Sequence, residues 1–188
     1  MNKNIKALAN LILFIGVMWL FWLADLVNDS LQILPNINSF GIIPRTFIGF
    51  IGIFTAPFLH SNIWHLFFNS ILLLLLAVFM AFFYYRTYAK SIVIIIAGGG
   101  LLVWLFGRNG NHIGSSGVIF GLLGYMIAGG IFRKRFWPFV VTLLILFLFG
   151  STFIFGILPE NSRISWESHL WGAGAGILAA WNYRKYNY

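Results

Sequence analysis

The sequence predicts an all-α membrane protein, a bundle of six transmembrane helices with both termini in the cytoplasm. Of its 188 residues, 60% are hydrophobic and only 9% are charged, whereas a soluble domain carries roughly 25% charged residues. The mean hydropathy is +0.89. Apolar runs of about twenty residues recur along the chain, and a run of this length spans a bilayer as a helix, because lipid-exposed backbone must satisfy its hydrogen bonds internally.

The first apolar run, at about 7–27, follows Lys3 and Lys6. It could be a signal peptide, but it exceeds the roughly 7–15 apolar residues of such a segment. No small-residue cleavage site follows it either, so we interpret it as an uncleaved span.

The other five spans are predicted over about 63–83, 91–106, 115–132, 137–155 and 165–181, in one domain over 1–188. The third, fourth and sixth spans are short for a bilayer core of about 30 Å, since a helix rises about 1.5 Å per residue. We therefore expect these three to lie inside the bundle, to thin the bilayer or to start below its surface.

Basic residues between the spans indicate the orientation. With a cytoplasmic N-terminus, the inner face holds Lys3, Lys6, Arg86, Lys90, Arg133, Lys134, Arg135, Arg184 and Lys185. The outer face then holds only Arg45, Arg108 and Arg163. This bias predicts an N-in, C-in topology. It also accounts for the net charge of +8 without nucleic-acid binding, which we exclude because no basic stripe with interleaved aromatic residues is present.

The longest connection, at about 28–62, lies on the outer side and contains the apolar stretch 47–59, which Gly49, Gly52 and Pro57 interrupt. This stretch is too short to span a bilayer. Two interpretations remain open: an element in the outer leaflet interface, in contact with membrane lipids, or a partly buried loop that covers the mouth of the bundle.

Four polar residues inside the apolar runs converge at one depth. His65 and Asn69 are four residues apart on one face of the second span, Ser116 begins the fourth, and His169 lies early in the sixth. All three spans run from outside to inside, so these side chains should gather near the outer surface. Polar groups are costly inside a membrane, which makes these four candidates for a functional site.

The four residue types match one reaction class, acyl transfer by an activated serine. The Ser116 hydroxyl needs a base to take its proton, and His169 can serve because imidazole titrates near neutral pH. No acidic residue lies in an apolar run at that depth, so we predict a Ser–His dyad rather than a triad. The Asn69 amide, the His65 ring N–H and the Ser116 backbone N–H are the candidate oxyanion donors.

Small residues around the dyad would let the helices approach closely. Gly114 and Gly117 flank the serine, and Phe120, one turn further on, could stack on the histidine ring. The two small-residue faces are Gly117, Gly121 and Gly124 in the fourth span and Gly172 and Gly176, after His169, in the sixth. Taken singly, each of these motifs is also explained by helix packing alone.

The sequence resembles the rhomboid family of intramembrane serine proteases. The resemblance rests on His60, His65 and Asn69, on Gly114-Ser115-Ser116-Gly117, and on His169 with Gly172. It implies that Ser116 is the nucleophile, His169 the general base, and His65, Asn69 and the Ser116 amide the oxyanion hole. It further implies transmembrane protein substrates cleaved near the outer surface, no metal or cofactor, and a multi-pass protein of the cell membrane.

Two other function classes remain as alternatives. A non-catalytic membrane protein that binds transmembrane helices would share the fold without needing a nucleophile. A metal or proton carrier could use the outer histidines, but no acidic residue lines a path through the membrane and no His-Glu-x-x-His motif is present. The histidines concerned are His60, His65, His112 and His169.

Overall fold

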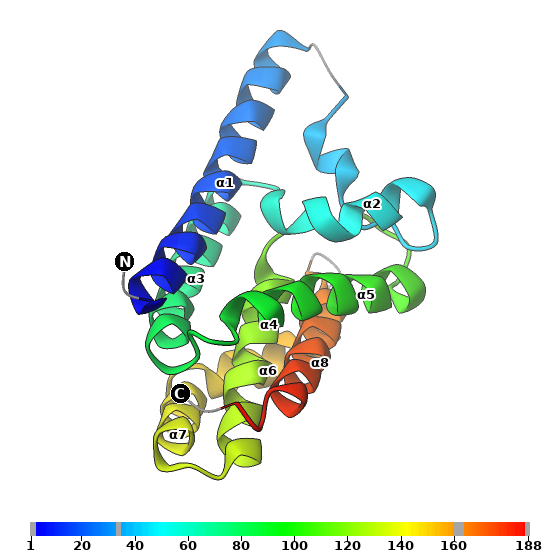
Figure 1. Ribbon diagram of the computed structural model, residues 1–188. Helices are drawn as coiled ribbons and strands as arrows, with labels where there is room; N and C mark the ends of the chain where they lie inside the picture. Colours follow the sequence, from blue (N-terminus) through cyan, green and yellow to red (C-terminus); the bar gives the residue numbers. More distant parts are fainter. Residues whose placement is uncertain (1–2, 33–34, 160–163, 187–188) are drawn as a thin grey trace.

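The computed structural model describes residues 3–32, 35–159 and 164–186. Within these ranges the chain is helical, and no strand occurs (Figure 1). The α-helices are α1 (Lys3–Leu31), α2 (Phe47–Thr55), α3 (Ile63–Phe83), α4 (Tyr88–Ile94), α5 (Gly100–Phe106), α6 (Ser116–Arg133), α7 (Phe136–Gly156) and α8 (Trp166–Asn182). Short 3₁₀ turns lie at Ile37–Phe40 and Ala56–Phe58, and a π-helical turn at Ile95–Gly99 joins α4 to α5.

Every predicted span corresponds to a helix. The described part of the chain contains five helices long and apolar enough to cross a membrane, with α4, the π turn and α5 counting as one, Tyr88–Phe106. The sixth predicted span forms α8, which has 17 residues and is shorter than these five. The protein is therefore an integral membrane protein, whereas the number of six spans and the N-in, C-in orientation stay predictions. Arg163, one of the basic residues assigned to the outer side, lies outside the described residues.

The centre of the bundle is the pair α6 and α8, which lie side by side (Figure 1). Their contact is backbone against backbone: a Cβ on Gly172 would meet the Gly117 carbonyl oxygen, and a Cβ on Gly176 would meet that of Gly121. Since only glycine fits such a contact, the spacing of small residues on both helices determines how deeply the two helices interlock.

The C-terminal end of α6 carries a buried arginine. The Arg133 side chain donates from Nη2 to Tyr125 Oη at 2.6 Å, and its guanidinium lies 4.8 Å from the centre of the Tyr84 ring. Burial raises the pKa of Tyr84 to about 12. The count of basic residues on each side of the membrane assumed that Arg133 is at the surface. Only 6% of this residue is exposed.

The apolar stretch 47–59 forms α2 and the 3₁₀ turn Ala56–Phe58. One face of α2 packs inward, where Gly49 lies against the backbone of Ile43 and Gly52 against that of Gly41. On its other face Phe47 is 81% exposed. A short helix with one packed face and one uncovered aromatic face favours the interpretation of an element in the outer leaflet interface.

Candidate active site

Ser116 is placed by a tightly held loop before α6. Ile42 and His112 exchange both backbone hydrogen bonds, at 3.0 and 2.9 Å, and the Gly114 N–H donates to the Ala56 carbonyl at 2.9 Å. Gly114 has a φ of +109°, a conformation that favours glycine. The loop therefore delivers Ser116 as the first residue of α6, where backbone N–H groups have no acceptor within the helix.

His169 lies in the first turn of α8, which Ser165 caps by accepting a hydrogen bond from the Ser168 N–H. The two ring nitrogens of His169 have different partners: Nε2 lies 2.9 Å from Ser116 Oγ, and Nδ1 lies 2.8 Å from the Gly156 carbonyl oxygen. A carbonyl can only accept, so Nδ1 carries the proton and Nε2 is left to accept from the serine hydroxyl. This tautomer can take the proton of Ser116 Oγ.

Phe120 supports the histidine ring. Its ring centroid lies 4.0 Å from that of His169 with an interplanar angle of 1°. On α7, Phe153 stacks near the same phenyl ring at 5.9 Å and 20°. The imidazole is thereby held in one plane by packing, in addition to its two hydrogen bonds.

His65 and Asn69 lie beside the loop that carries the serine. A Cβ on Gly114 would come 2.7 Å from the ring of His65 and 3.6 Å from Asn69 Nδ2. Both side chains line the same cavity as Ser116 and His169. The structure thus gathers all four polar residues predicted for the site around one space.

His60 orients the Asn69 amide. Its Nδ1 lies 3.3 Å from the Phe58 carbonyl oxygen, so Nδ1 is the protonated nitrogen and Nε2 accepts from Asn69 Nδ2 at 3.2 Å. Burial and the neighbouring His65 lower the pKa of His60 to about 4. At neutral pH His60 is therefore an uncharged acceptor that fixes which way the amide points.

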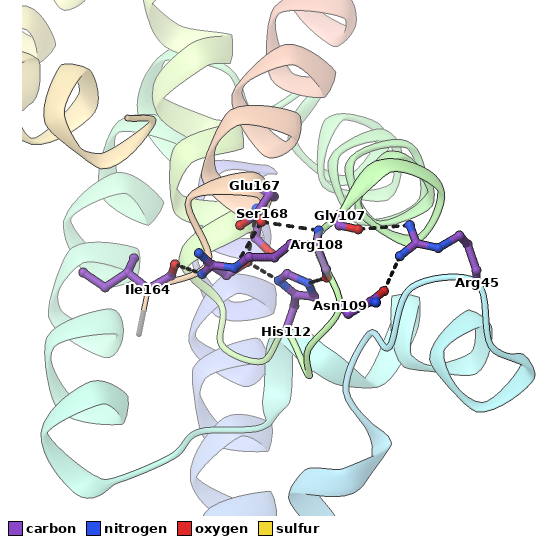
Figure 2. A network of polar contacts seen from close by, with 9 residues as sticks. Arg45, Gly107, Arg108, Asn109, His112, Ile164, Glu167 and Ser168 are labelled. Carbon is purple, nitrogen blue, oxygen red and sulfur yellow. Dashed lines mark hydrogen bonds and ion pairs between the residues drawn. The ribbon is translucent and has the colours of Figure 1, made fainter. Parts of the chain in front are cut away.

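A polar network forms one rim of the site (Figure 2). Arg108 pairs with the buried carboxylate of Glu167 at 3.2 Å and donates to the Ile164 carbonyl at 2.6 Å. His112 links the same loop to α8, because its Nδ1 lies 2.6 Å from Ser165 Oγ. These contacts hold the loop before Ser116 against the first turn of α8, which carries His169.

Arg45 extends this rim toward α2 (Figure 2). Its Nη1 donates to the Leu105 and Gly107 carbonyls at 3.1 and 3.0 Å, and its Nη2 donates to Asn109 Oδ1 at 2.6 Å. The end of α5 is thereby tied to the connection that leads into α2.

A cavity of about 640 Å³ contains the dyad. It extends from Asn69 and Leu72 past Ser116 and His169 to the rim at Asn109. The cavity gives the serine hydroxyl a space in which another molecule can approach it.

The four histidines have different hydrogen-bond partners, although His65, His112 and His169 all line the cavity. In the ranges that the structure describes, no group of three or more His, Cys, Asp or Glu side chains is arranged to hold a metal ion. The rings of His60 and His65 are in contact, with centroids 5.0 Å apart in an edge-on arrangement.

Sequence reasoning missed three features of the site. It gave no role to the Gly156 carbonyl, to His60 as the partner of Asn69, or to the pairing of Arg108 with Glu167. The last had a signal, since Arg108 follows the run 91–106 and Glu167 lies at the start of the run 165–181. A backbone carbonyl has none, because every residue carries one. The expectation that no acidic residue lies in an apolar run at the depth of the dyad was wrong, because Glu167 is buried in the first turn of α8, two residues before His169.

Comparison with known proteins identifies relatives over most of the chain. The rhomboid domain family matches residues 49–186. "Uncharacterized protein Rv1337" of Mycobacterium tuberculosis is 34% identical over 176 residues, which cover 89% of this chain and 71% of that protein. "Uncharacterized protein ML1171" of Mycobacterium leprae is 29% identical over 189 residues, covering 96% of this chain and 74% of the relative.

No solved structure matches the chain significantly. The family match covers more than half of the chain and includes every helix from the start of α3 to the end of α8. It confirms the resemblance inferred from the histidine, asparagine and serine motifs. The chain belongs to the rhomboid family.

Proposed function

We propose that the protein is an intramembrane serine endopeptidase of the cell membrane, with Ser116 as the nucleophile and His169 as the general base. The observation that carries this proposal is the contact of 2.9 Å between Ser116 Oγ and His169 Nε2, with Nδ1 held by a backbone acceptor. In the reaction, Oγ attacks the substrate carbonyl carbon while its proton passes to Nε2. The imidazolium then gives that proton to the leaving amine as the C–N bond breaks, which leaves an acyl group on Ser116. A water molecule, with His169 again as the base, hydrolyses this ester and restores the serine hydroxyl.

The oxyanion that forms would be stabilised by the Ser116 backbone N–H, the Asn69 amide and the His65 ring. These donors are held in place before the reaction, since Asn69 is bonded to His60 and Gly114 lets the loop lie against His65. Apolar side chains such as Leu72, Ile119 and Phe120 also line the cavity, and such surroundings strengthen each hydrogen bond to the developing charge.

The substrate class that fits is a transmembrane protein whose helix unwinds near the outer surface. A stable helix keeps its peptide bonds inside the hydrogen-bonded ladder, where the serine could not reach them. The cavity around Ser116 would receive the unwound segment, and the uncovered face of α2 would contact membrane lipids.

Labelling with a fluorophosphonate, which reacts only with an activated serine, tests the proposal in purified protein and in liposomes. Wild type should be labelled and should cleave a model transmembrane substrate, while Ser116→Ala should lose at least about a thousandfold in both. Ser115→Ala is the matched control: within the described residues its buried Oγ has no hydrogen-bond partner, so labelling should persist. Equal labelling of wild type and Ser116→Ala would favour a non-catalytic protein that binds transmembrane helices.

A further inference from the structure

The C-terminal end of α7 contacts His169. Gly156 is the last residue of α7, and the last carbonyl groups of a helix have no intrahelical donor. We propose that the Gly156 carbonyl is the third member of the catalytic array, a positioning group that fixes the tautomer and orientation of His169. This inference rests on the proposed function. It makes the activity depend on where α7 ends.

The acceptor at Nδ1 has two effects on the reaction. It keeps the proton on Nδ1, so that Nε2 is free to accept when the Ser116 O–H bond breaks. Once Nε2 is protonated the ring is positively charged, and the carbonyl belongs to the negative end of the α7 dipole. The same group therefore orients the neutral ring and stabilises the charged one.

The nearby carboxylate has another partner. Glu167, two residues before His169, is paired with Arg108 at 3.2 Å on the rim of the site. The place that a buried aspartate takes beside the histidine of a catalytic triad is here taken by a backbone oxygen at 2.8 Å.

Gly156 also has to be glycine. A Cβ at this position would meet the end of the Phe120 ring, and that ring cannot move aside freely because it is stacked on His169 and on Phe153. One end of α7 thus controls both the hydrogen bond to the imidazole and the ring beneath it. Elsewhere α7 packs mainly on α6 and only lightly on α3 and α8.

A backbone ester tests the carbonyl directly. Replacing Ile157 by its α-hydroxy acid turns the Gly156 carbonyl into an ester carbonyl, which is a weaker acceptor, and leaves all side chains in place. We expect kcat to fall about tenfold with KM within twofold. The control is the same replacement at Leu148, in the lipid-facing part of α7 beside Phe147, which is 86% exposed. It removes one helix hydrogen bond far from the site and should change kcat less than twofold.

Two glycine-to-alanine substitutions in α7 test the packing of Gly156 against Phe120. Gly156→Ala should lower activity at least about tenfold, because the added methyl displaces Phe120. Gly150→Ala makes the same change six residues earlier, where a Cβ meets nothing within 4 Å, and should leave activity unchanged.

The ¹⁵N spectrum of the His169 ring, assigned with His169→Gln, reports the tautomer whether or not the protein turns over. Wild type should show a protonated Nδ1, and the ester at 157 should weaken that signature. Unchanged kcat and an unchanged ring spectrum in the ester variant would overturn the inference. A wild type without Ser116-dependent labelling would instead overturn the proposed function, while the ring spectrum would still decide the positioning role.

Discussion

Two helices pack on α6, and they do so in different ways. The seam with α8 is made of glycines and alanines, so that backbone meets backbone along several turns, as at Gly117 and Gly172. The seam with α7 contains larger side chains, although Gly130 of α6 also lies close to Pro138 and Thr142. Thr142 donates across it to the carbonyls of Met126 and Ile127 at 2.9 and 3.1 Å. The outward side of α7 carries exposed aromatic and leucine side chains.

The difference separates two tasks of the site. The α6–α8 seam determines the distance between Ser116 and His169, and it is rigid because a methyl group on Gly124, Gly172 or Gly176 would collide with the backbone of the facing helix. The α7 seam determines the orientation of the histidine through Gly156, and its side-chain contacts can yield at lower cost. Three substitution experiments, taken from the largest expected effect to the smallest, test this difference.

The largest effect is expected from filling the α6–α8 seam. Gly172→Val places a side chain against the Gly117 carbonyl, so the helices must separate, at a cost of about 3 kcal/mol or more. Labelling of Ser116 should be lost as His169 moves away. Gly174→Val is the control, because a Cβ on Gly174 meets nothing within 4 Å. Unfolding in detergent and labelling check both variants, and equal behaviour would show that the seam is not rigid.

The second-largest effect is a loss of stability on acidification, which we expect from His60, just before α3. The pKa of His60 is lowered from 6.5 to about 4 by burial and by His65, so between these values the unfolded chain binds the proton and the folded one does not. Stability therefore falls as pH falls, by about 3 kcal/mol between pH 7 and pH 4.

The measurement is the difference in unfolding free energy between wild type and His60→Gln across this pH range. Glutamine can still accept from Asn69 but does not titrate. Titrating groups far from His60 cancel in the difference, whereas His65 is coupled to His60, so His60→Gln is also measured in a His65→Gln background. A constant difference between pH 7 and pH 4 would contradict the assignment of His60 as a neutral acceptor.

The smallest effect is expected at the α7 seam. Thr142→Val keeps the shape of the side chain and removes its hydrogen bonds to α6, which should cost about 1 kcal/mol. Cleavage should stay within twofold of wild type. Thr142→Ser retains the hydroxyl and separates the lost bond from the lost methyl group. A cost as large as that of Gly172→Val would remove the distinction between the two seams.

Much of the helix pattern was predictable from residue order alone. The span predicted at 63–83 coincides with α3, and those at 115–132 and 137–155 differ from α6 and α7 by one residue at each end. Apolar runs between basic residues and glycines define such boundaries well, because lipid leaves few alternatives to a helix. Arg133 shows the limit of this reasoning, since its position beside an apolar run does not reveal that it is buried between aromatic rings.

The fold class and the set of polar side chains that could meet follow from residue order, because polar groups are few in an apolar chain and their depth follows from helix length. How these groups are oriented depends on tertiary packing. The tautomer of His169 depends on the Gly156 carbonyl, the direction of the Asn69 amide depends on His60, and the rim depends on Arg108 with Glu167. Backbone oxygens occur at every residue, so which of them faces a side chain is settled by packing and not by composition.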